Sequence, residues 1–229
     1  MDDRRSGPPG FVARVVTGRF TAEDIEQAGA AHAALGLALA WLAGIGRTWQ
    51  NPRVTLLQHL GLGSVAYVVV LSAFLWLLLL PLRPERWSLL KIVAFVGATS
   101  PLGFLYAIPV DRFLSLGGAR RAHLAFLAVV SLWRVILYAL FLFRYARLRN
   151  VRLVVGTLFP LAVIVFTLTA LNLERAVFDF MSGINPHSGT PGDSAYAFLF
   201  LLSVLSFFAA PMLALLYVVA IAQSFMAKT

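Results

Sequence analysis

Long apolar runs separated by short polar connections dominate the hydropathy pattern of the chain. Six runs approach or exceed the roughly 20 apolar residues that a helix needs to cross the hydrocarbon core of a bilayer. They cover residues 27–46, 61–82, 89–110, 123–143, 153–171 and 195–222. The second run includes SVAYVVVLSAFLWLLLLPL, which has no charged residue. The pattern therefore predicts an all-α fold, a polytopic transmembrane bundle of about six helices.

The first residues follow a different pattern from the apolar runs. The apolar side chains of FVARVVTGRF fall close to one helical face beside two arginines, which is typical of an amphipathic helix in a membrane interface. We therefore expect residues 1–20 to form a cytoplasmic interfacial segment, with a disordered basic tail as the alternative. Thr21 can cap a following helix with Asp24 at its third position, so we expect the first membrane helix to begin there and the transmembrane domain to span 21–229.

The longest connection lies between the fifth and sixth apolar runs, at residues 172–194. Its first part has the helical spacing of an amphipathic helix, and its second part is rich in Gly and Pro. If the chain crosses the membrane six times, the segments between the runs lie alternately on its two sides. Lys and Arg are about twice as frequent in the segments on the side of the N-terminus as in those on the other side. The positive-inside rule then places both termini in the cytoplasm and the 172–194 loop outside, as in a bacterial inner-membrane protein. No apolar run typical of a cleavable signal peptide follows MDDRRSGPPG.

Composition strengthens the membrane interpretation. Of the 229 residues, 60% are hydrophobic and 13% are charged, whereas a soluble domain carries about a quarter charged residues. The net charge of +9 suits anionic lipid headgroups at the membrane surface. Nucleic-acid binding is disfavoured because no basic patch is interleaved with aromatic residues.

Small residues recur every four positions in the first apolar run, at Gly36, Ala40 and Gly44. In lipid, this spacing lets two helix backbones come into contact. We expect the contact to be made within the bundle, and a contact between two copies of the chain is the alternative.

Arg134 lies deep in the fourth apolar run, where an arginine costs about 2.5–3.5 kcal/mol on insertion scales. An arginine cannot avoid this cost by losing its proton. His123, Ser131, Arg134 and Tyr138 fall on one stripe of the predicted helix, and the other faces are apolar. We therefore expect this polar stripe to face protein or water.

The sequence offers Arg134 no acidic partner, because no Asp or Glu occurs within the six apolar runs. Hydroxyl and carbonyl groups remain, and the nearest source is GATSPLG, where Pro101 breaks the helical hydrogen bonding beside Thr99 and Ser100. We predict that the stripe packs against this broken helix. Two interpretations stay open. Arg134 either binds an anion, such as a lipid phosphate or a carboxylate substrate, or bonds internal carbonyls and locks the bundle.

Motifs for catalysis or metal binding are missing from the sequence. There is no cysteine, and the four histidines lack the spacing of a metal site. No G-x-S-x-G nucleophile elbow and no phosphate-binding P-loop is present. We expect a protein that is not an enzyme and that uses no metal and no other cofactor.

Residues 95–170 resemble the bacterial branch of the Yip1-domain membrane proteins. The resemblance consists of a Pro-containing helix (VGATSPLGFLYAIP), a helix with a basic exit (SLWRVILYALFLFRYARLR) and a further run with Pro (VVGTLFPLAVIVF). The DLYGP-like motif of the eukaryotic members is not found, and the sixth run exceeds the usual five-helix pattern. The resemblance implies a non-enzymatic scaffold in membrane organisation or trafficking.

The leading functional hypothesis is therefore a non-catalytic scaffold or accessory subunit acting through helix and lipid contacts. Its partners would be membrane lipids and another membrane protein or a second copy of the chain. The alternative is a small transporter or permease component that holds an anionic substrate or a lipid headgroup at Arg134.

Overall fold

The computed structural model describes residues 7–49, 56–171 and 193–226, and all of its regular elements are helices. Six helical segments in these residues are long and apolar enough to cross a membrane, which confirms the predicted fold class. They are α3 (Ala30–Thr48), α5 (Leu62–Leu79) with the 3₁₀ helix η1 (Leu80–Leu82), α6 (Leu89–Ala98) with the 3₁₀ helix η2 (Ser100–Ala107), α7 (Leu116–Arg144), α8 (Asn150–Ala170) and α10 (Asp193–Met226). The shorter elements are α1 (Pro8–Val16), α2 (Ala22–Gln27), α4 (Leu56–His59) and η3 (Val110–Arg112).

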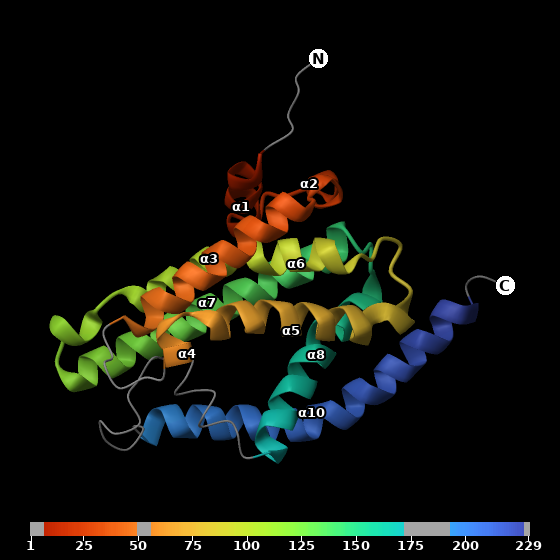
Figure 1. The fold of residues 1–229 in the computed structure, drawn as a ribbon. Coiled ribbons are helices and arrows are strands. Elements are labelled where there is room, and N and C mark those ends of the chain that lie inside the picture. Colours follow the sequence, from red (N-terminus) through yellow and green to blue (C-terminus); the bar gives the residue numbers. More distant parts are fainter. Residues whose placement is uncertain (1–6, 50–55, 172–192, 227–229) are drawn as a thin grey trace.

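Helices α3, α5, α6 and α7 run side by side and form the main body of the bundle (Figure 1). Helix α8 leaves this body at a steep angle and packs mainly along α10. Helices α1 and α2 lie at one end of the body, over α3 and α6. Because α8 and α10 diverge from the main body, α5 and α8 make few contacts with each other.

The outer surface of the bundle is apolar. Val70 of α5 is 66% exposed, and Phe208 of α10 is 73% exposed. Exposing such side chains to water along whole helices would be costly, whereas hydrocarbon accommodates them. The chain is therefore a multi-pass membrane protein.

Small residues allow α3 to come into backbone contact with its neighbours. A Cβ atom added to Gly36 would lie 2.9 Å from the Cα of Gly97 in α6. A Cβ atom added to Gly44 would lie 2.6 Å from Ser64 Oγ and 2.8 Å from the carbonyl oxygen of Gly61. Both glycines of α3 thus lie where any side chain would push the helices apart.

Pro101 ends regular α-helix in the third membrane segment. Its ring leaves no N–H to continue the α-helical ladder, and the chain changes from α6 to η2 at this point. Thr99 takes part in the transition, because its hydroxyl donates to the carbonyl of Val96 at 2.7 Å. The Thr99 carbonyl of this turn faces Arg134 of α7, whose Nη2 lies 3.5 Å from it.

The first membrane helix does not begin at Thr21, contrary to the sequence-based expectation. Thr21 caps the separate helix α2, which ends at Gln27, and α3 begins at Ala30 after a break with extended backbone. The break is stabilised from outside, because the Nζ of Lys91 in α6 donates to the carbonyls of Glu26 and Ala28.

A capping box and an ion pair fix α2. The backbone N–H of Thr21 donates to the Asp24 carboxylate at 2.8 Å, and the Asp24 N–H donates to the Thr21 hydroxyl. The Arg14 guanidinium lies 2.8 Å from the same carboxylate. Partial burial would raise the pKa of Asp24, but the hydrogen bonds from Thr21 and the Arg14 charge outweigh it and lower that pKa.

The apolar face of α1 lies against protein. Phe11 and Val15 are at most 1% exposed and belong to the apolar core that α3 and α6 share. The expected amphipathic helix of the 172–194 connection lies outside the described residues.

Candidate functional site

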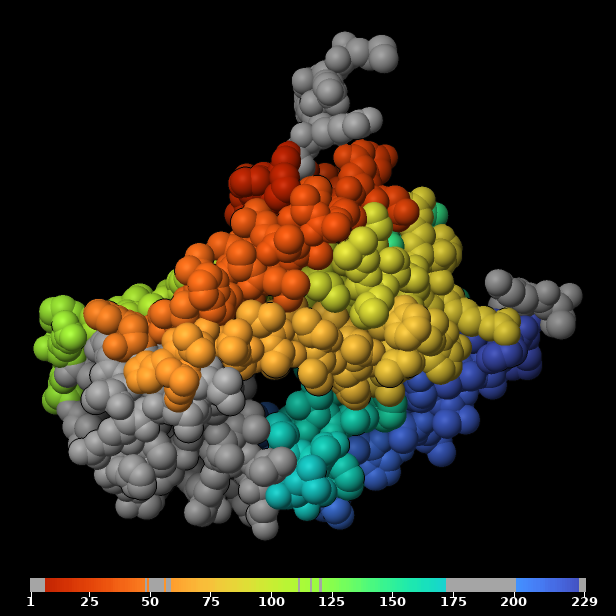
Figure 2. Space-filling model, in the orientation of Figure 1, coloured from red at the N-terminus to blue at the C-terminus, as the bar shows by residue number. Residues whose placement is uncertain are grey.

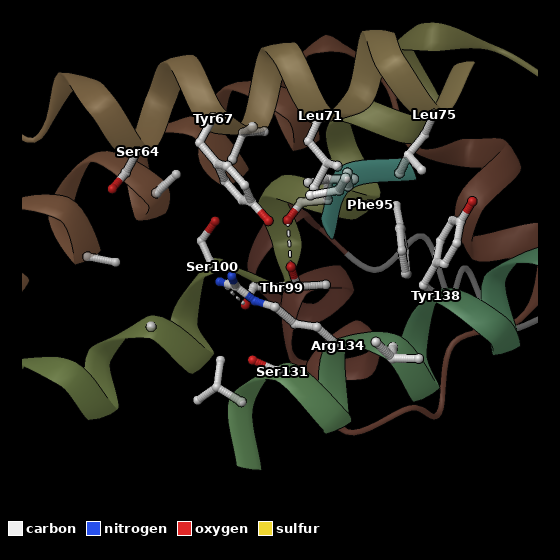
Figure 3. Close-up of a pocket in the computed structure, with 18 of the residues that line it drawn as sticks. Ser64, Tyr67, Leu71, Leu75, Phe95, Thr99, Ser100, Ser131, Arg134 and Tyr138 are labelled. Carbon is white, nitrogen blue, oxygen red and sulfur yellow. Dashed lines mark hydrogen bonds between the residues drawn. The ribbon is translucent and has the colours of Figure 1, made fainter. Parts of the chain in front are cut away.

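A cavity of about 520 Å³ lies inside the bundle. Helices α3, α5, α6, α7 and α8 and the 3₁₀ helix η2 all contribute to its walls. The steep departure of α8 leaves room for this space, because α8 makes few contacts with α5. Figure 3 shows the side chains that converge on it.

Arg134 projects from α7 into this cavity (Figure 3). Its Nη2 donates to the carbonyl of Thr99 at 3.5 Å, a long and therefore weak hydrogen bond. Its buried Nε has no hydrogen-bond partner among the described residues. The prediction that Arg134 turns inward toward the broken third segment thus agrees with the position of its side chain.

The structure brings most of the sequence-predicted site residues together. Thr99, Ser100, Ser131 and Tyr138 line the same cavity as Arg134. Tyr138 is already engaged, because its hydroxyl donates to the Gly156 carbonyl of α8 at 3.1 Å and so ties α7 to α8.

The remaining predicted residues lie elsewhere or have another role. His123 is buried but does not line the cavity, so the expected stripe contributes to it only from Ser131 onward. Among the small residues of α3, Ala40 lines the cavity, while Gly36 and Gly44 make the helix contacts described above.

A second arginine, Arg47, lines the cavity from the end of α3. In the sequence, Arg47 directly follows the first apolar run and is not among the predicted site residues. Its guanidinium carbon lies 5.3 Å from the centre of the Tyr106 ring, within the range of a cation–π contact. A signal was available in the sequence, because Ala40, Ala43 and Arg47 follow spacings of three and four residues and share one helix face.

The cavity carries a concentrated positive charge. Arg47 and Arg134 both line it, and no Asp or Glu is among its described lining residues. The two guanidinium groups are close enough for the charge on Arg134 to act on Arg47, and both act on the hydroxyl of Tyr106. In surroundings of low dielectric, an anion beside Arg134 would offset its positive charge.

Hydroxyl groups accompany the two charges. Ser64 and Tyr67 reach the cavity from α5, and the Tyr67 hydroxyl points toward its middle (Figure 3). Ser100 adds a hydroxyl from η2 on the opposite wall. No hydrogen bond joins these three side chains to other described residues, so their donors are available to a ligand.

The rest of the cavity wall is apolar. Leu75 and Phe95 lie at the end away from Ser64 (Figure 3), and α8 adds Leu161 and Ile164. The space between α5 and α8 is open on the surface, where Figure 2 shows a hollow between the two helices. The cavity therefore has a cationic part rich in hydroxyls and an apolar part bordered by the sparsely packed α5 and α8.

The described residues contain no group of three or more His, Cys, Asp or Glu that could hold a metal ion. The side chains that line the cavity can donate hydrogen bonds and offset negative charge. Comparison of the chain with models of known protein families, with curated proteins and with solved structures finds no match.

Proposed function

We propose that this membrane protein binds an anionic amphiphile, with the anionic group at Arg134 and the apolar part along α8, as a small transporter or permease component. The observation that carries the proposal is the position and the hydrogen bonding of the Arg134 side chain. Its guanidinium points into a cavity of about 520 Å³ and makes a single long hydrogen bond to a described residue. A bound anion would offset the positive charge and accept the unused donors.

The geometry favours binding over a purely structural lock. A lock would satisfy several of the five guanidinium N–H donors with internal carbonyls. Here the Thr99 carbonyl is the one acceptor found among the described residues, and the buried Nε has none. Arg134 is half-buried, and a charge partly withdrawn from water without such partners is costly, so an anionic ligand provides a physical reason for the arrangement.

The form of the cavity favours an amphiphile over a small polar anion. A polar anion would gain nothing from the apolar wall formed by Leu75, Phe95 and Ile164. An alkyl chain would remove this wall from contact with water. The opening between α5 and α8 gives such a molecule a lateral route from the bilayer.

Neither binding nor transport requires a chemical step, so the proposal includes no enzymatic activity. The orientation proposed with it has both termini in the cytoplasm of a bacterial cell. A scaffold role of the kind implied by the Yip1-domain resemblance stays a prediction of the sequence, and the cavity adds no support for it.

Lipids that co-purify with the protein test the proposal. The wild type and Arg134→Leu are purified in the same nonionic detergent, and bound anionic lipids are quantified by mass spectrometry. We expect Arg134→Leu to lose most of the bound anionic amphiphile while its helical circular dichroism and thermal unfolding stay close to those of the wild type. Equal lipid in both proteins would contradict the proposal.

Arg149→Leu is the matched control. Arg149 is exposed, and its guanidinium carbon lies 3.8 Å from the centre of the Phe143 ring, outside the cavity. This variant removes the same charge from the surface, so it should retain the bound lipid. A different set of results would support the structural lock instead. In that case Arg134→Leu fails to fold, Arg134→Lys folds normally, and the wild type carries no bound lipid.

A further inference from the structure

We infer that Tyr138 is a positioning residue for a lateral gate of the cavity, and that this gate turns about Pro160 and Pro211. The gate consists of residues 161–170 of α8 and 201–210 of α10. The inference rests on the proposed function, because it describes how an amphiphile would pass between the bilayer and the same cavity. It is carried by the positions of the two prolines relative to the contacts that hold α8 and α10.

Pro160 interrupts the hydrogen bonding of α8 near its middle. A proline has no backbone N–H, so the carbonyl four residues earlier, that of Gly156, loses its α-helical donor. The Tyr138 hydroxyl of α7 donates to this same carbonyl at 3.1 Å. A neighbouring helix thus supplies the hydrogen bond that the proline removes, as the hydrocarbon core requires. The bond between α7 and α8 therefore acts at the point where α8 is weakest.

The half of α8 before Pro160 packs against the main body. A Cβ atom added to Gly156 would lie 3.2 Å from the Leu148 side chain and 3.3 Å from the side chains of both Leu142 and Leu79. Leu142 belongs to α7 and Leu79 to α5. Contacts with two helices therefore fix this half.

The half of α10 after Pro211 is fixed at the other end of the pair. Pro211 lies inside α10, whose two halves differ in direction (Figure 1). The Tyr217 hydroxyl donates to the Leu78 carbonyl of α5, and the Ser224 hydroxyl donates to the Pro81 carbonyl of η1 at 3.3 Å. These bonds fasten the end of α10 to the main body.

On the other side of the two prolines, α8 and α10 hold each other. The Thr169 hydroxyl donates to the Ser203 hydroxyl at 2.9 Å, and the rings of Phe166 and Phe207 stack with their centres 6.3 Å apart. The main contacts of α10 are with α8 and η1. The two segments of the gate therefore form one unit that is joined to the fixed halves at the prolines.

This unit borders the cavity and its opening. Leu161, Ile164 and Leu168 line the cavity from the gate, and Figure 2 shows the hollow between α5 and α8. On the other side of the gate, Leu205 and Phe208 are exposed. Few contacts between α5 and α8 oppose an outward rotation. Such a rotation would widen the opening and leave the fixed halves of both helices in place.

The Tyr138 hydrogen bond sets the balance between the closed and the open gate. Tyr138→Phe retains the ring but removes the donor, and the loss of one hydrogen bond shifts such a balance about two- to tenfold. Entry and exit both require opening, so both rates should rise by the same factor. The dissociation constant should stay unchanged, because the hydroxyl donates to Gly156 and not to the ligand.

Stopped-flow measurements with purified protein in nonionic detergent test this expectation. Protein loaded with bromododecanoate, whose bromine quenches tryptophan fluorescence, is mixed with excess dodecanoate, and calorimetry gives the dissociation constant. We expect Tyr138→Phe to release the probe about two- to tenfold faster with the same dissociation constant. Thr157→Val is the matched control. It removes a hydroxyl beside Gly156 that donates to Leu153 of the same helix, so it should release the probe at the wild-type rate.

Pro160→Ala tests the hinge. It restores an N–H that can donate to the Gly156 carbonyl within α8, so the probe should leave more slowly. In this background, Tyr138→Phe should affect release less than it does in the wild type, because α8 no longer depends on Tyr138 for the bond. Equal effects in the two backgrounds would overturn the hinge at Pro160.

Spin labels measure the gate without any ligand. The chain has no cysteine, so introduced cysteines take the labels specifically. Val70→Cys with Leu205→Cys joins α5 to the gate, and Val70→Cys with Leu215→Cys joins α5 to the fixed half of α10; all three positions are exposed. The distance distribution of the first pair should be the broader one and should broaden further in Tyr138→Phe. Equal widths that Tyr138→Phe does not change would overturn the gate.

The outcomes distinguish this inference from the proposed function. Equal release of bound probe from the wild type and Tyr138→Phe would overturn the gate and leave an anionic amphiphile at Arg134. A changed dissociation constant would make the Tyr138 hydroxyl a ligand contact and overturn its positioning role. Failure of bromododecanoate to bind the wild type would overturn the proposed function, and the spin-label distances would still decide whether the gate moves.

Discussion

Gly36 and Gly97 face each other where α3 crosses α6, and their backbones are in direct contact. A Cβ atom on either glycine would lie 2.9 Å from the backbone of the other. This contact supports the cavity, because α3 carries Arg47 and the segment after Gly97 carries Thr99 and Ser100. The two sides of the cationic part are therefore held at a fixed separation by a pair of glycines.

Gly36→Ala should destabilise the bundle. The added methyl group would meet backbone atoms that no side-chain rotation can move, and overpacking of this kind costs about 1–3 kcal/mol. We expect the midpoint of thermal unfolding in detergent to fall by several degrees. Gly117→Ala is the control, since no heavy atom lies within 4 Å of the added Cβ. Equal unfolding midpoints for the two variants would argue against the contact.

Arg144 anchors the N-terminal segment to the end of α7. Its Nη1 donates to the carbonyls of Gly18 and Phe20, both at 2.8 Å. Trp133 adds a second link, because its Nε1 donates to the Val16 carbonyl at 2.8 Å. These bonds hold the turn between α1 and α2 against α7.

Arg144→Gln should loosen the N-terminal segment without unfolding the bundle. Loss of charge-assisted hydrogen bonds of about 1.5–3 kcal/mol corresponds to roughly 10–100-fold more opening of the docked segment. Hydrogen exchange measured by mass spectrometry should become faster in peptides covering residues 7–27 and stay unchanged in α5. Arg149→Gln, which removes an exposed charge, should leave both regions unchanged. Equal exchange in residues 7–27 of the two variants would refute the anchoring role.

The helices were predictable from the sequence because hydropathy over about 20 residues requires no knowledge of tertiary contacts. All six segments occur in the structure. The break after Gln27 was not predicted in the same way, since Thr21 has the sequence signature of a helix start and Gly29, which begins α3 as its N-cap, lies in a run that otherwise looks helical. The donor that stabilises the break, Lys91, comes from another helix.

The candidate site was predictable in part. Arg134 stood out because a charge within an apolar run needs an explanation, and Thr99 and Ser100 stood out beside a proline. Arg47 did not, because an arginine at the end of a membrane helix is usual at an interface. Its position in the cavity follows from the way α3 packs, and a single sequence does not specify which helices become neighbours.

Ionisation of the Tyr145 hydroxyl makes the stability of the bundle depend on pH in the alkaline range. It lies just after α7, is 2% exposed and packs on Phe141 with ring centres 5.2 Å apart. Burial raises the pKa of Tyr145 to about 12, and the Glu26 carboxylate adds to the effect while Arg86 opposes it. In the unfolded chain, the pKa of a tyrosine is about 10. The stabilising effect of the neutral hydroxyl is therefore complete below pH 10 and is lost as pH rises toward 12.

The wild type should consequently lose stability between pH 10 and 12 more steeply than Tyr145→Phe. The variant retains the aromatic ring and its contact with Phe141, but it has no proton to lose. Other tyrosines and the lysines also titrate in this range, so the informative quantity is the difference between the two unfolding midpoints as a function of pH. That difference should be constant from pH 7 to 9.5 and should then shift in favour of Tyr145→Phe. Parallel curves up to pH 12 would show that the Tyr145 hydroxyl ionises as easily in the folded protein as in the unfolded chain.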